Sequence, residues 1–330
     1  MILRLSLTIK KTRHSGNTIS PMPSTVRTSS PSPRSPGTTP RRRRCPLRRL
    51  VGDRAFTLIE LLVTISVIAV LISIALPTLK NARGVARQTR EMIAGQQLMV
   101  AFNCYATDHK NAVLVGLPSA ATVNSSMLVN DDRGRRLLAP AAQRYPWRIA
   151  PYFTTGIVAL YDNVKLMTDL RDAGDRYEKI GFHYPYFFSL FPALGMNVAF
   201  VGGSVDHGMD PLSERTFGRR HVARMDEPRQ PSRLITFASA RPSPTWTFPD
   251  IGSTEGYFLV EAPYSSRRRW ASAYSEKDPN SSGFVALRHN KKAISAMFDG
   301  HVETLGFAEL DDMTRWSDKA TDAAWFVGKK

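Results

Sequence analysis

The chain has 330 residues, with 45 Lys and Arg against 28 Asp and Glu, and a formal net charge of +17. Apolar residues make up 42% of the sequence and aromatic residues 9%, which is enough for a hydrophobic core and excludes a wholly disordered chain. Two cysteines, Cys45 and Cys104, exclude a disulfide-stabilised scaffold, and a single long apolar run excludes a membrane protein with several spans. The charge, taken alone, points to an anionic partner such as nucleic acid.

The positive charge is concentrated at the N-terminus. Residues 1–55 carry 13 Lys and Arg and one acid, Asp53, whereas the other 275 residues carry 32 basic and 27 acidic side chains. Seven prolines lie among Ser and Thr in residues 12–50, and four arginines follow one another at 41–44. Such a segment buries little and repels itself, so we expect a disordered leader. Its arginine run could bind nucleic acid, but its place before an apolar segment favours a cytoplasmic topology signal.

Residues 56–79, which we call the span, form an apolar segment of 24 residues whose one ionisable side chain is Glu60. A helix of that length measures about 36 Å, enough to cross a hydrocarbon core of about 30 Å. Seven Lys and Arg precede the span within twenty residues and four follow it, which predicts a cytoplasmic N-terminus and an extracytoplasmic C-terminal part. The run is too long for a typical secretory signal and no small-x-small site follows it, so we expect a retained single-pass anchor.

A helical pattern continues from the span to about Tyr105, so we expect one helix over residues 56–107. Two rows of apolar residues seven positions apart predict a buried stripe, and the remaining polar residues predict the opposite face. The stripe consists of Val85, Met92, Met99, Ala86, Ile93 and Val100, and the polar face of Arg83, Arg87, Arg90, Glu91 and Gln97. We expect the stripe to pack on the chain's own soluble part, with Pro77 and Gly84 kinking or loosening the helix.

Residues 108–330, which we call the head, contain short apolar runs between clusters of Gly, Pro, Asn and Ser. Several of these runs are predicted strands, which indicates an α+β head with an antiparallel sheet. The runs are 112–117, 156–161, 198–201, 234–238, 256–260, 283–287, 293–298 and 301–305. The tail at 308–325 is predicted as a short helix or a loop.

A second motif lies near the C-terminus, where nine residues separate His289 from Asp299 and Gly300. The segment is predicted as strand, turn, strand, Asp-Gly turn and strand, because Gly accepts positive φ and Asp bonds the local backbone. Alternation places Ile294, Ala296 and Phe298 on one face. We expect His289 to hydrogen-bond across this hairpin to Asp299. A metal site formed by His289, Asp299 and His301 is the alternative, although no further ligand pair completes it.

The residues Arg54-Ala55-Phe56-Thr57-Leu58-Ile59-Glu60 resemble the class III signal of type IV pilins and type II secretion pseudopilins. The resemblance implies that a prepilin peptidase cuts between Ala55 and Phe56 and methylates the new amino terminus of Phe56. The chain has Ala55 where the family usually has glycine. In that family the residue equivalent to Glu60 neutralises the amino terminus of a neighbouring subunit during assembly, and a proline recurs at the position of Pro77.

The His289, Asp299 and Gly300 spacing resembles the His-x9-Asp-Gly signature of a prepilin-like family, and residues 194–197 and 200–203 look like that family's central region. The resemblance implies a lollipop of one long helix and an α+β head. Some pseudopilins bind calcium in a C-terminal loop, for which Asp278, Asn280 and Asp299 could offer oxygens. We otherwise expect no cofactor.

The two resemblances together imply a structural subunit of a pilus or pseudopilus. Its partners would be the peptidase and methyltransferase, other pilin-like subunits and an inner-membrane assembly platform. No phosphate-binding loop or nucleophile elbow is present, so we do not expect an enzyme. We expect no nucleic-acid partner, because such a partner would require the basic residues 1–50 to stay attached and cytoplasmic. The alternative is an extracytoplasmic binding or enzymatic domain that uses the same anchor without polymerising.

Overall fold

The structure, a computed structural model, describes residues 57–153, 156–161, 164–178, 183–204, 215, 218–242 and 256–328. The chain divides into two units, residues 1–61 and 62–330. The predicted leader, with Cys45, lies outside the described residues. The elements are α1 (Leu58–Asp108), α2 (Ala120–Ser126), η1 (Ala141–Gln143), α3 (Tyr145–Ile149), η2 (Ala150–Tyr152), η3 (Ile157–Leu160), α4 (Val164–Tyr177), α5 (Tyr184–Leu190), β1 (Leu194–Met196), β2 (Ile235–Ser239), η6 (Pro279–Ser282), β3 (Lys292–Met297), β4 (Val302–Gly306), α7 (Phe307–Leu310) and η7 (Met313–Arg315).

The predicted long helix is confirmed as α1, whose 51 residues end three residues beyond Tyr105. The helix continues through Pro77 and Gly84. Residues 57–87 are all exposed, and burial begins at Glu91. The C-terminal third of α1 is therefore the part that packs into the head.

The predicted buried stripe of α1 is wrong in part. Met99 is buried, but Val85, Ile93 and Val100 are exposed. The buried face instead consists of Glu91, Gly95, Leu98, Met99, Ala101, Phe102 and Ala106. A Cβ atom at Gly95 would lie 3.4 Å from a methyl group of Val302 on β4, at ordinary van der Waals distance, so the sheet packs directly against this turn of the helix. Because a glycine and a glutamate lie within this face, hydrophobicity alone did not reveal it.

The four strands form one antiparallel sheet in the order β1-β2-β3-β4. β2 and β3 are central, and almost all of their residues are buried on both faces. The predicted Asp-Gly turn is confirmed: Gly300 has φ 99°, and the amide of Met297 donates to the carbonyl of His301 at 2.8 Å. The α+β class with a long N-terminal helix and an antiparallel sheet is confirmed.

Three of the eight predicted runs form strands, namely β2, β3 and β4. The run at 156–161 contains the 3-10 helix η3 instead, and the runs at 112–117 and 256–260 contribute only isolated bridges. Short apolar runs do not by themselves distinguish strands from other buried segments. In the tail, α7 and η7 confirm a short helix.

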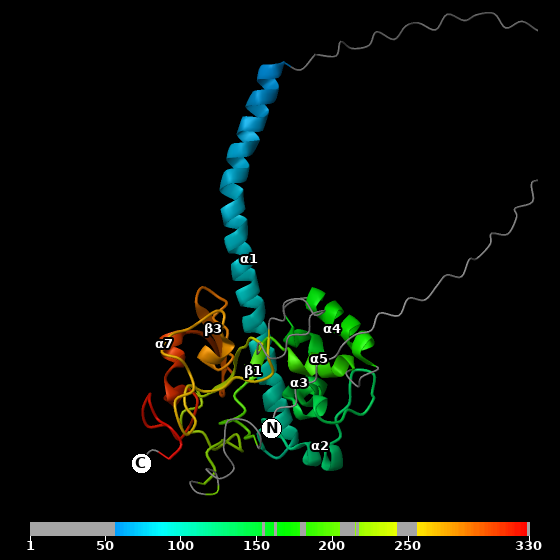
Figure 1. Ribbon diagram of the computed structural model, residues 1–330, viewed down its shortest axis with the longest axis vertical. Helices are drawn as coiled ribbons and strands as arrows, with labels where there is room; N and C mark the ends of the chain where they lie inside the picture. The colour runs from blue at the N-terminus through cyan, green and yellow to red at the C-terminus, as the bar shows by residue number, and fades with distance from the viewer. Residues whose placement is uncertain are drawn as a thin grey trace, which may run out of the picture. The chain divides into compact units, whose positions relative to one another are not determined.

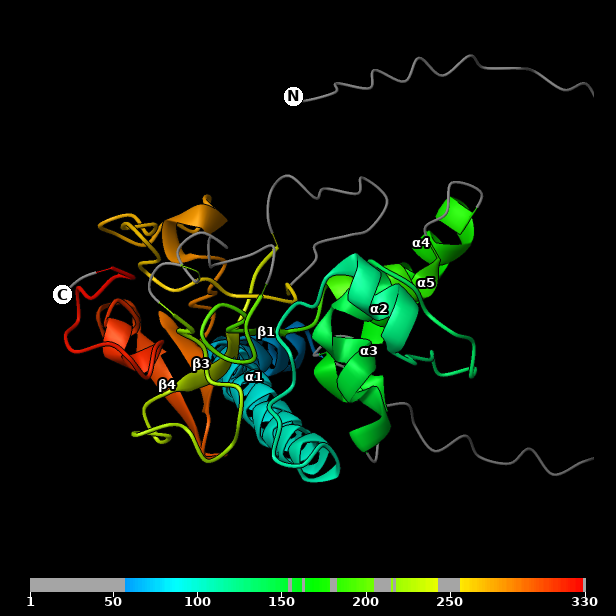
Figure 2. The ribbon, with the colours of Figure 1, turned by 90° about the horizontal axis from the view of Figure 1, so that it is seen from below.

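Within residues 62–330, the end of α1 lies between the sheet and the helices α2 to α5, as two perpendicular views show (Figures 1 and 2). On the sheet side, the ring of Phe102 meets those of Phe237 and Phe298 edge-on, each with centroids 5.9 Å apart. On the helical side, Tyr105 meets Tyr152 edge-on at 5.8 Å. Both halves of the head are thus built around the same helix, which makes α1 part of the core.

Candidate functional site

The start of α1 is closed by a capping box between Thr57 and Glu60. The hydroxyl of Thr57 accepts from the amide of Glu60 at 3.2 Å, and the Glu60 carboxylate accepts from the amide and hydroxyl of Thr57, each at 2.9 Å. This arrangement satisfies backbone donors that the first helical turn leaves unpaired. Glu60 therefore has a local structural partner besides the assembly role that the sequence predicts. The predicted processing residues, Ala55 and Phe56, lie outside the described residues.

The span meets the requirements of a membrane-crossing helix. By length and composition, α1 contains a window apolar enough to cross a bilayer, and none of that window is buried in the protein. The hydroxyls of Ser66, Ser73 and Thr78 donate to carbonyls three or four residues earlier, so the polar side chains of the span are satisfied within the helix. Pro77 also lies inside α1, and it has no backbone N–H group to donate to the helix.

A second constellation lies where α1 enters the head. We call it the Glu91 cluster; it consists of Glu91 on α1, Ser239 on β2, and Arg288 and His289 just before β3. Ser239 donates to one carboxylate oxygen of Glu91 at 2.5 Å, and His289 Nε2 donates to the other at 2.7 Å. The Nε atom of Arg288 lies 3.7 Å from the same oxygen as His289 Nε2. Glu91 is only 1% exposed, so this acid fixes α1 to the sheet from inside the protein.

The neighbours of Glu91 compensate for its burial. Burial alone would raise the pKa of the Glu91 carboxyl group, but the charge of Arg288 and the hydrogen bonds from His289 and Ser239 outweigh it and lower the pKa below its ordinary value of 4.5. The carboxylate is therefore ionised at neutral pH. Because an ionised carboxylate only accepts hydrogen bonds, His289 must carry a proton on Nε2.

The Glu91 cluster predicts a specific loss of stability in acid. A carboxyl group whose pKa is lowered by folding contributes stability above its unfolded value of 4.5, and this contribution is lost as the pH falls below it. We expect the difference in unfolding midpoint between the wild type and Glu91→Gln to be constant from pH 7 to 5 and to shrink below about 4.5. Denaturant unfolding followed by tryptophan fluorescence measures it. Parallel curves down to pH 3.5 would contradict the role given to the carboxylate.

The predicted bond between His289 and Asp299 is wrong. His289 bonds Glu91, and Asp299 instead accepts from Nδ1 of His301 at 2.6 Å and from the amide of His301 at 3.2 Å. Only the backbone of His289 crosses a hairpin, to Lys292, around two residues with positive φ, Asn290 and Lys291. The side chain of His289 turns to α1 because a buried carboxylate is available there.

The residues considered for a metal are engaged elsewhere. Asp278 accepts from the amide of Asn280 at 3.0 Å and so caps η6, and Asp299 pairs with His301. Among the residues that the structure describes, no three His, Cys, Asp or Glu side chains lie close enough to hold a metal ion. Cys104 is an exposed free thiol.

The central segment with the second resemblance is a packing element. Asn197 is fully buried after β1, and its side-chain amide donates to the carbonyls of Ile235 and Trp316, each at 2.9 Å. Gly202 has φ 75°, and a Cβ atom there would lie 2.0 Å from the carbonyl oxygen of Leu114. These two residues join β1, β2, the C-terminal segment and the loop after α1, so both act in folding.

Sequence reasoning missed Glu91 and Ser239 as functional residues. The pattern of polar residues predicts Glu91 on the polar face of the helix, and no sequence motif includes Ser239. A usable signal exists for Glu91, because Gly95, Leu98 and Phe102 follow it at intervals of four, three and four residues, which places all four on one helical face. Ser239 has no comparable signal.

Comparison with known proteins bears on the N-terminal motif around Phe56 and Glu60. No curated protein and no solved structure matches the chain. The family model described as "Prokaryotic N-terminal methylation motif" matches residues 52–76, a segment that includes Ala55, Phe56 and Glu60 and ends before Pro77. The chain therefore carries a prepilin-type N-terminal motif joined to a helix able to cross a membrane, which supports a type IV pilin-like family.

Proposed function

We propose that this chain is a prepilin-like structural subunit that assembles through its N-terminal helix into a pilus or pseudopilus. The observation that carries the proposal is the methylation motif at residues 52–76, which overlaps the first part of α1, a helix whose residues up to 87 are all exposed. A helix that is apolar all round is stable only in lipid or among other helices. Neighbouring copies of such a helix would supply that environment once the subunit leaves the bilayer.

Maturation removes the basic leader. In the proposal a prepilin peptidase cuts between Ala55 and Phe56 and methylates Phe56, so the new amine lies within a few residues of Glu60 in the chain. The leader takes with it most of the excess positive charge, since residues 1–55 hold 13 basic side chains and one acid. Before cleavage, the charge of the leader keeps the N-terminus in the cytoplasm, so that the head is extracytoplasmic on a single-pass anchor.

Assembly uses the surfaces of α1 that the head leaves free. Val85, Ile93 and Val100 are exposed beyond the span and offer an apolar row to neighbouring helices. The partners are the peptidase and methyltransferase, other pilin-like subunits and an inner-membrane platform, in either a type IV pilus or a type II secretion system. The protein is a substrate of processing enzymes and is not itself an enzyme.

The mature N-terminus tests the proposal. We expect mass spectrometry of the protein from its native membrane to find a chain that begins with N-methylated Phe56. Conversion of Phe56 to aspartate should leave the leader attached, whereas Val85→Ala, outside the motif, should leave processing unchanged. An intact Met1 in the wild type, or a cut beyond Leu79, would overturn the proposal.

One observation favours the second candidate function, a tethered domain that binds a ligand without polymerising. The head contains a pocket of about 630 Å³, within the range of small-molecule sites. Ligand binding and polymerisation can be separated, because the pocket belongs to the head and the assembly surface to the exposed part of α1.

A further inference from the structure

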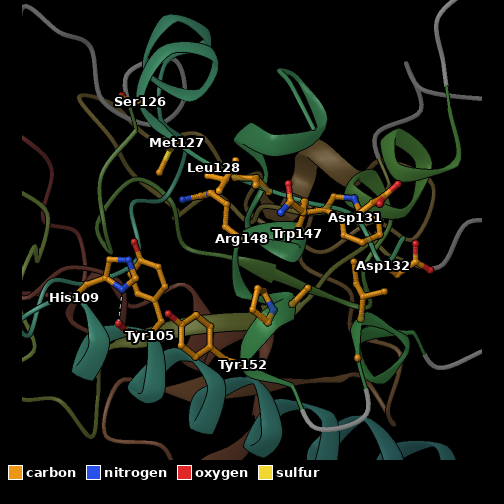
Figure 3. Close-up of a pocket in the computed structure, with 16 residues that line it drawn as sticks. Tyr105, His109, Ser126, Met127, Leu128, Asp131, Asp132, Trp147, Arg148 and Tyr152 are labelled. Carbon is orange, nitrogen blue, oxygen red and sulfur yellow. Dashed lines mark hydrogen bonds between the residues drawn. The ribbon is translucent and has the colours of Figure 1, made fainter. Parts of the chain in front are cut away.

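The pocket lies beside the C-terminal end of α1, the loop after α2 and the segment α3–η2 (Figure 3). Its lining includes Tyr105, His109, Leu128, Trp147, Arg148 and Tyr152. None of these residues belongs to the motif at residues 52–76 or to the Glu91 cluster. We call it the Arg148 pocket.

Arg148 is a buried cation without an acidic partner. Its guanidinium donates to the carbonyls of Val115, Gly116 and Gln143 at 2.5, 2.8 and 3.0 Å, and its Nε atom is buried without any partner. The residue is only 6% exposed, and no carboxylate among the described residues contributes to its electrostatic environment. Buried charges are usually paired, so a buried arginine that lines a pocket and lacks a counter-charge marks a place for an anion.

The cation persists at neutral pH. Burial lowers the pKa of Arg148 to about 10, and the nearby Tyr105 partly opposes this effect. A group with that pKa remains almost fully protonated at pH 7. The pocket therefore holds a permanent positive charge in a partly desolvated setting, where electrostatic attraction is stronger than in water.

Aromatic rings form the wall next to Arg148. The rings of Tyr105 and His109 stack with centroids 3.9 Å apart and an angle of 12° between them, and Tyr152 meets Tyr105 edge-on. His109 Nδ1 donates to the carbonyl of Tyr105 at 2.8 Å, which fixes the orientation of the imidazole ring. Such a wall suits a flat ligand with an apolar face.

The acids that also line the pocket are already compensated. Asp131 forms an ion pair with Arg135 at 2.8 Å and accepts from the amides of Arg133 and Arg135. Asp132 accepts from the hydroxyl of Tyr184. Among the described residues that line the pocket, Asp131 has an arginine partner and Asp132 has a hydroxyl donor. The buried charge of Arg148 has no acidic partner.

We propose that the Arg148 pocket binds a small carboxylate carried on a six-membered ring, with the carboxylate directed toward the guanidinium and the ring lying against the tyrosine and histidine rings. Sugar acids and aromatic acids share this chemistry. Phosphate alone offers the charge without the ring, and neutral sugars or phenols offer the ring without the charge.

Binding to the full chain in lipid nanodiscs tests the proposal, with saturation-transfer NMR as the readout. Two matched pairs serve as probes, glucuronate against glucose and 4-hydroxybenzoate against 4-hydroxybenzamide. We expect at least one acid to bind saturably, and its neutral counterpart to bind about tenfold or more weakly because it lacks the charge-assisted contact. Which acid binds identifies the source. Failure of both acids, or equal binding by acid and neutral partner, would overturn the proposal.

Substitutions at Leu128 test the location of the site without disturbing the core. Leu128 lines the pocket and is 78% exposed, so its variants should fold. Leu128→Asp should weaken binding of the acid by about three- to tenfold through repulsion, whereas Leu128→Asn should leave it nearly unchanged and Leu128→Lys should strengthen it. If aspartate and asparagine have equal effects, the anion does not bind here. Arg148→Gln should abolish binding of the acid, with a denaturation curve recorded to confirm that the variant is folded.

Discussion

Replacement of Glu91 by alanine is expected to lower the free energy of unfolding of the head by about 3–5 kcal/mol, the usual cost of removing one partner from a buried ion pair. Three groups would lose their acceptor or counter-charge, namely the Ser239 hydroxyl, His289 Nε2 and the Arg288 guanidinium. Two of these residues, Ser239 and His289, are themselves buried, so water cannot easily replace the carboxylate. Denaturant unfolding followed by fluorescence of the buried residues Trp147 and Trp316 measures the change.

Two controls separate the cluster from general effects on the helix. Gln97 is exposed on the same helix, so Gln97→Ala should change stability by less than about 0.5 kcal/mol. In a double-mutant cycle, Glu91→Ala and His289→Ala should couple by about 0.5–3 kcal/mol, because the two side chains are in direct contact. Additive effects would show that the contact between them contributes nothing of its own.

The N-terminal features could be predicted from the sequence because they are local. Charge counts on both sides of the span, the run of apolar residues and the seven-residue motif all lie within one stretch of chain. The Thr57 and Glu60 capping box is also readable, since the two residues have the Thr-x-x-Glu spacing. Helix geometry is set by neighbours a few residues away, so such features survive without knowledge of the fold.

The Glu91 cluster could not be predicted because its members are far apart in the sequence. Ser239 follows Glu91 by 148 positions, and His289 follows it by 198. Nothing in the local pattern tells an exposed glutamate from one that meets a histidine across the fold. The Arg148 pocket has the same origin, since α1, the loop after α2 and α3 meet only in three dimensions. The sequence motif singles out His289 but predicts a hydrogen bond to Asp299, the acid in the same motif, and not to Glu91.

The helices of the head were missed for a different reason. In α4 the buried residues Leu166, Leu170 and Ala173 follow a spacing of four and three, which is a readable helical pattern. Several neighbouring helices span seven residues or fewer, too short for a period to stand out. The runs at 112–117 and 156–161 resemble strands and favoured strands in this part of the head, and tertiary packing overrode that tendency.

Replacement of Glu60 is expected to reduce incorporation into filaments by roughly tenfold or more while cleavage before Phe56 continues, since an unmatched amine within hydrocarbon is costly. In the proposed assembly the carboxylate of one subunit neutralises the methylated amine of the next. The fraction of processed protein in sheared filaments, relative to that in membranes, measures incorporation. Mass spectrometry of both fractions confirms that the leader has been removed.

The capping box supplies the control that separates charge from helix structure. Glu60→Gln removes the charge but keeps a side chain that can accept from the Thr57 amide, whereas Glu60→Ala removes both. If charge matching drives assembly, the glutamine variant should fail as severely as the alanine variant. If the capping box is the essential feature, the glutamine variant should assemble normally and Thr57→Val should fail instead. Normal assembly of the alanine variant would remove both explanations, because neither the carboxylate nor its cap would then be needed in a filament, whereas absence of the processed wild type from filaments would favour an anchor that does not polymerise.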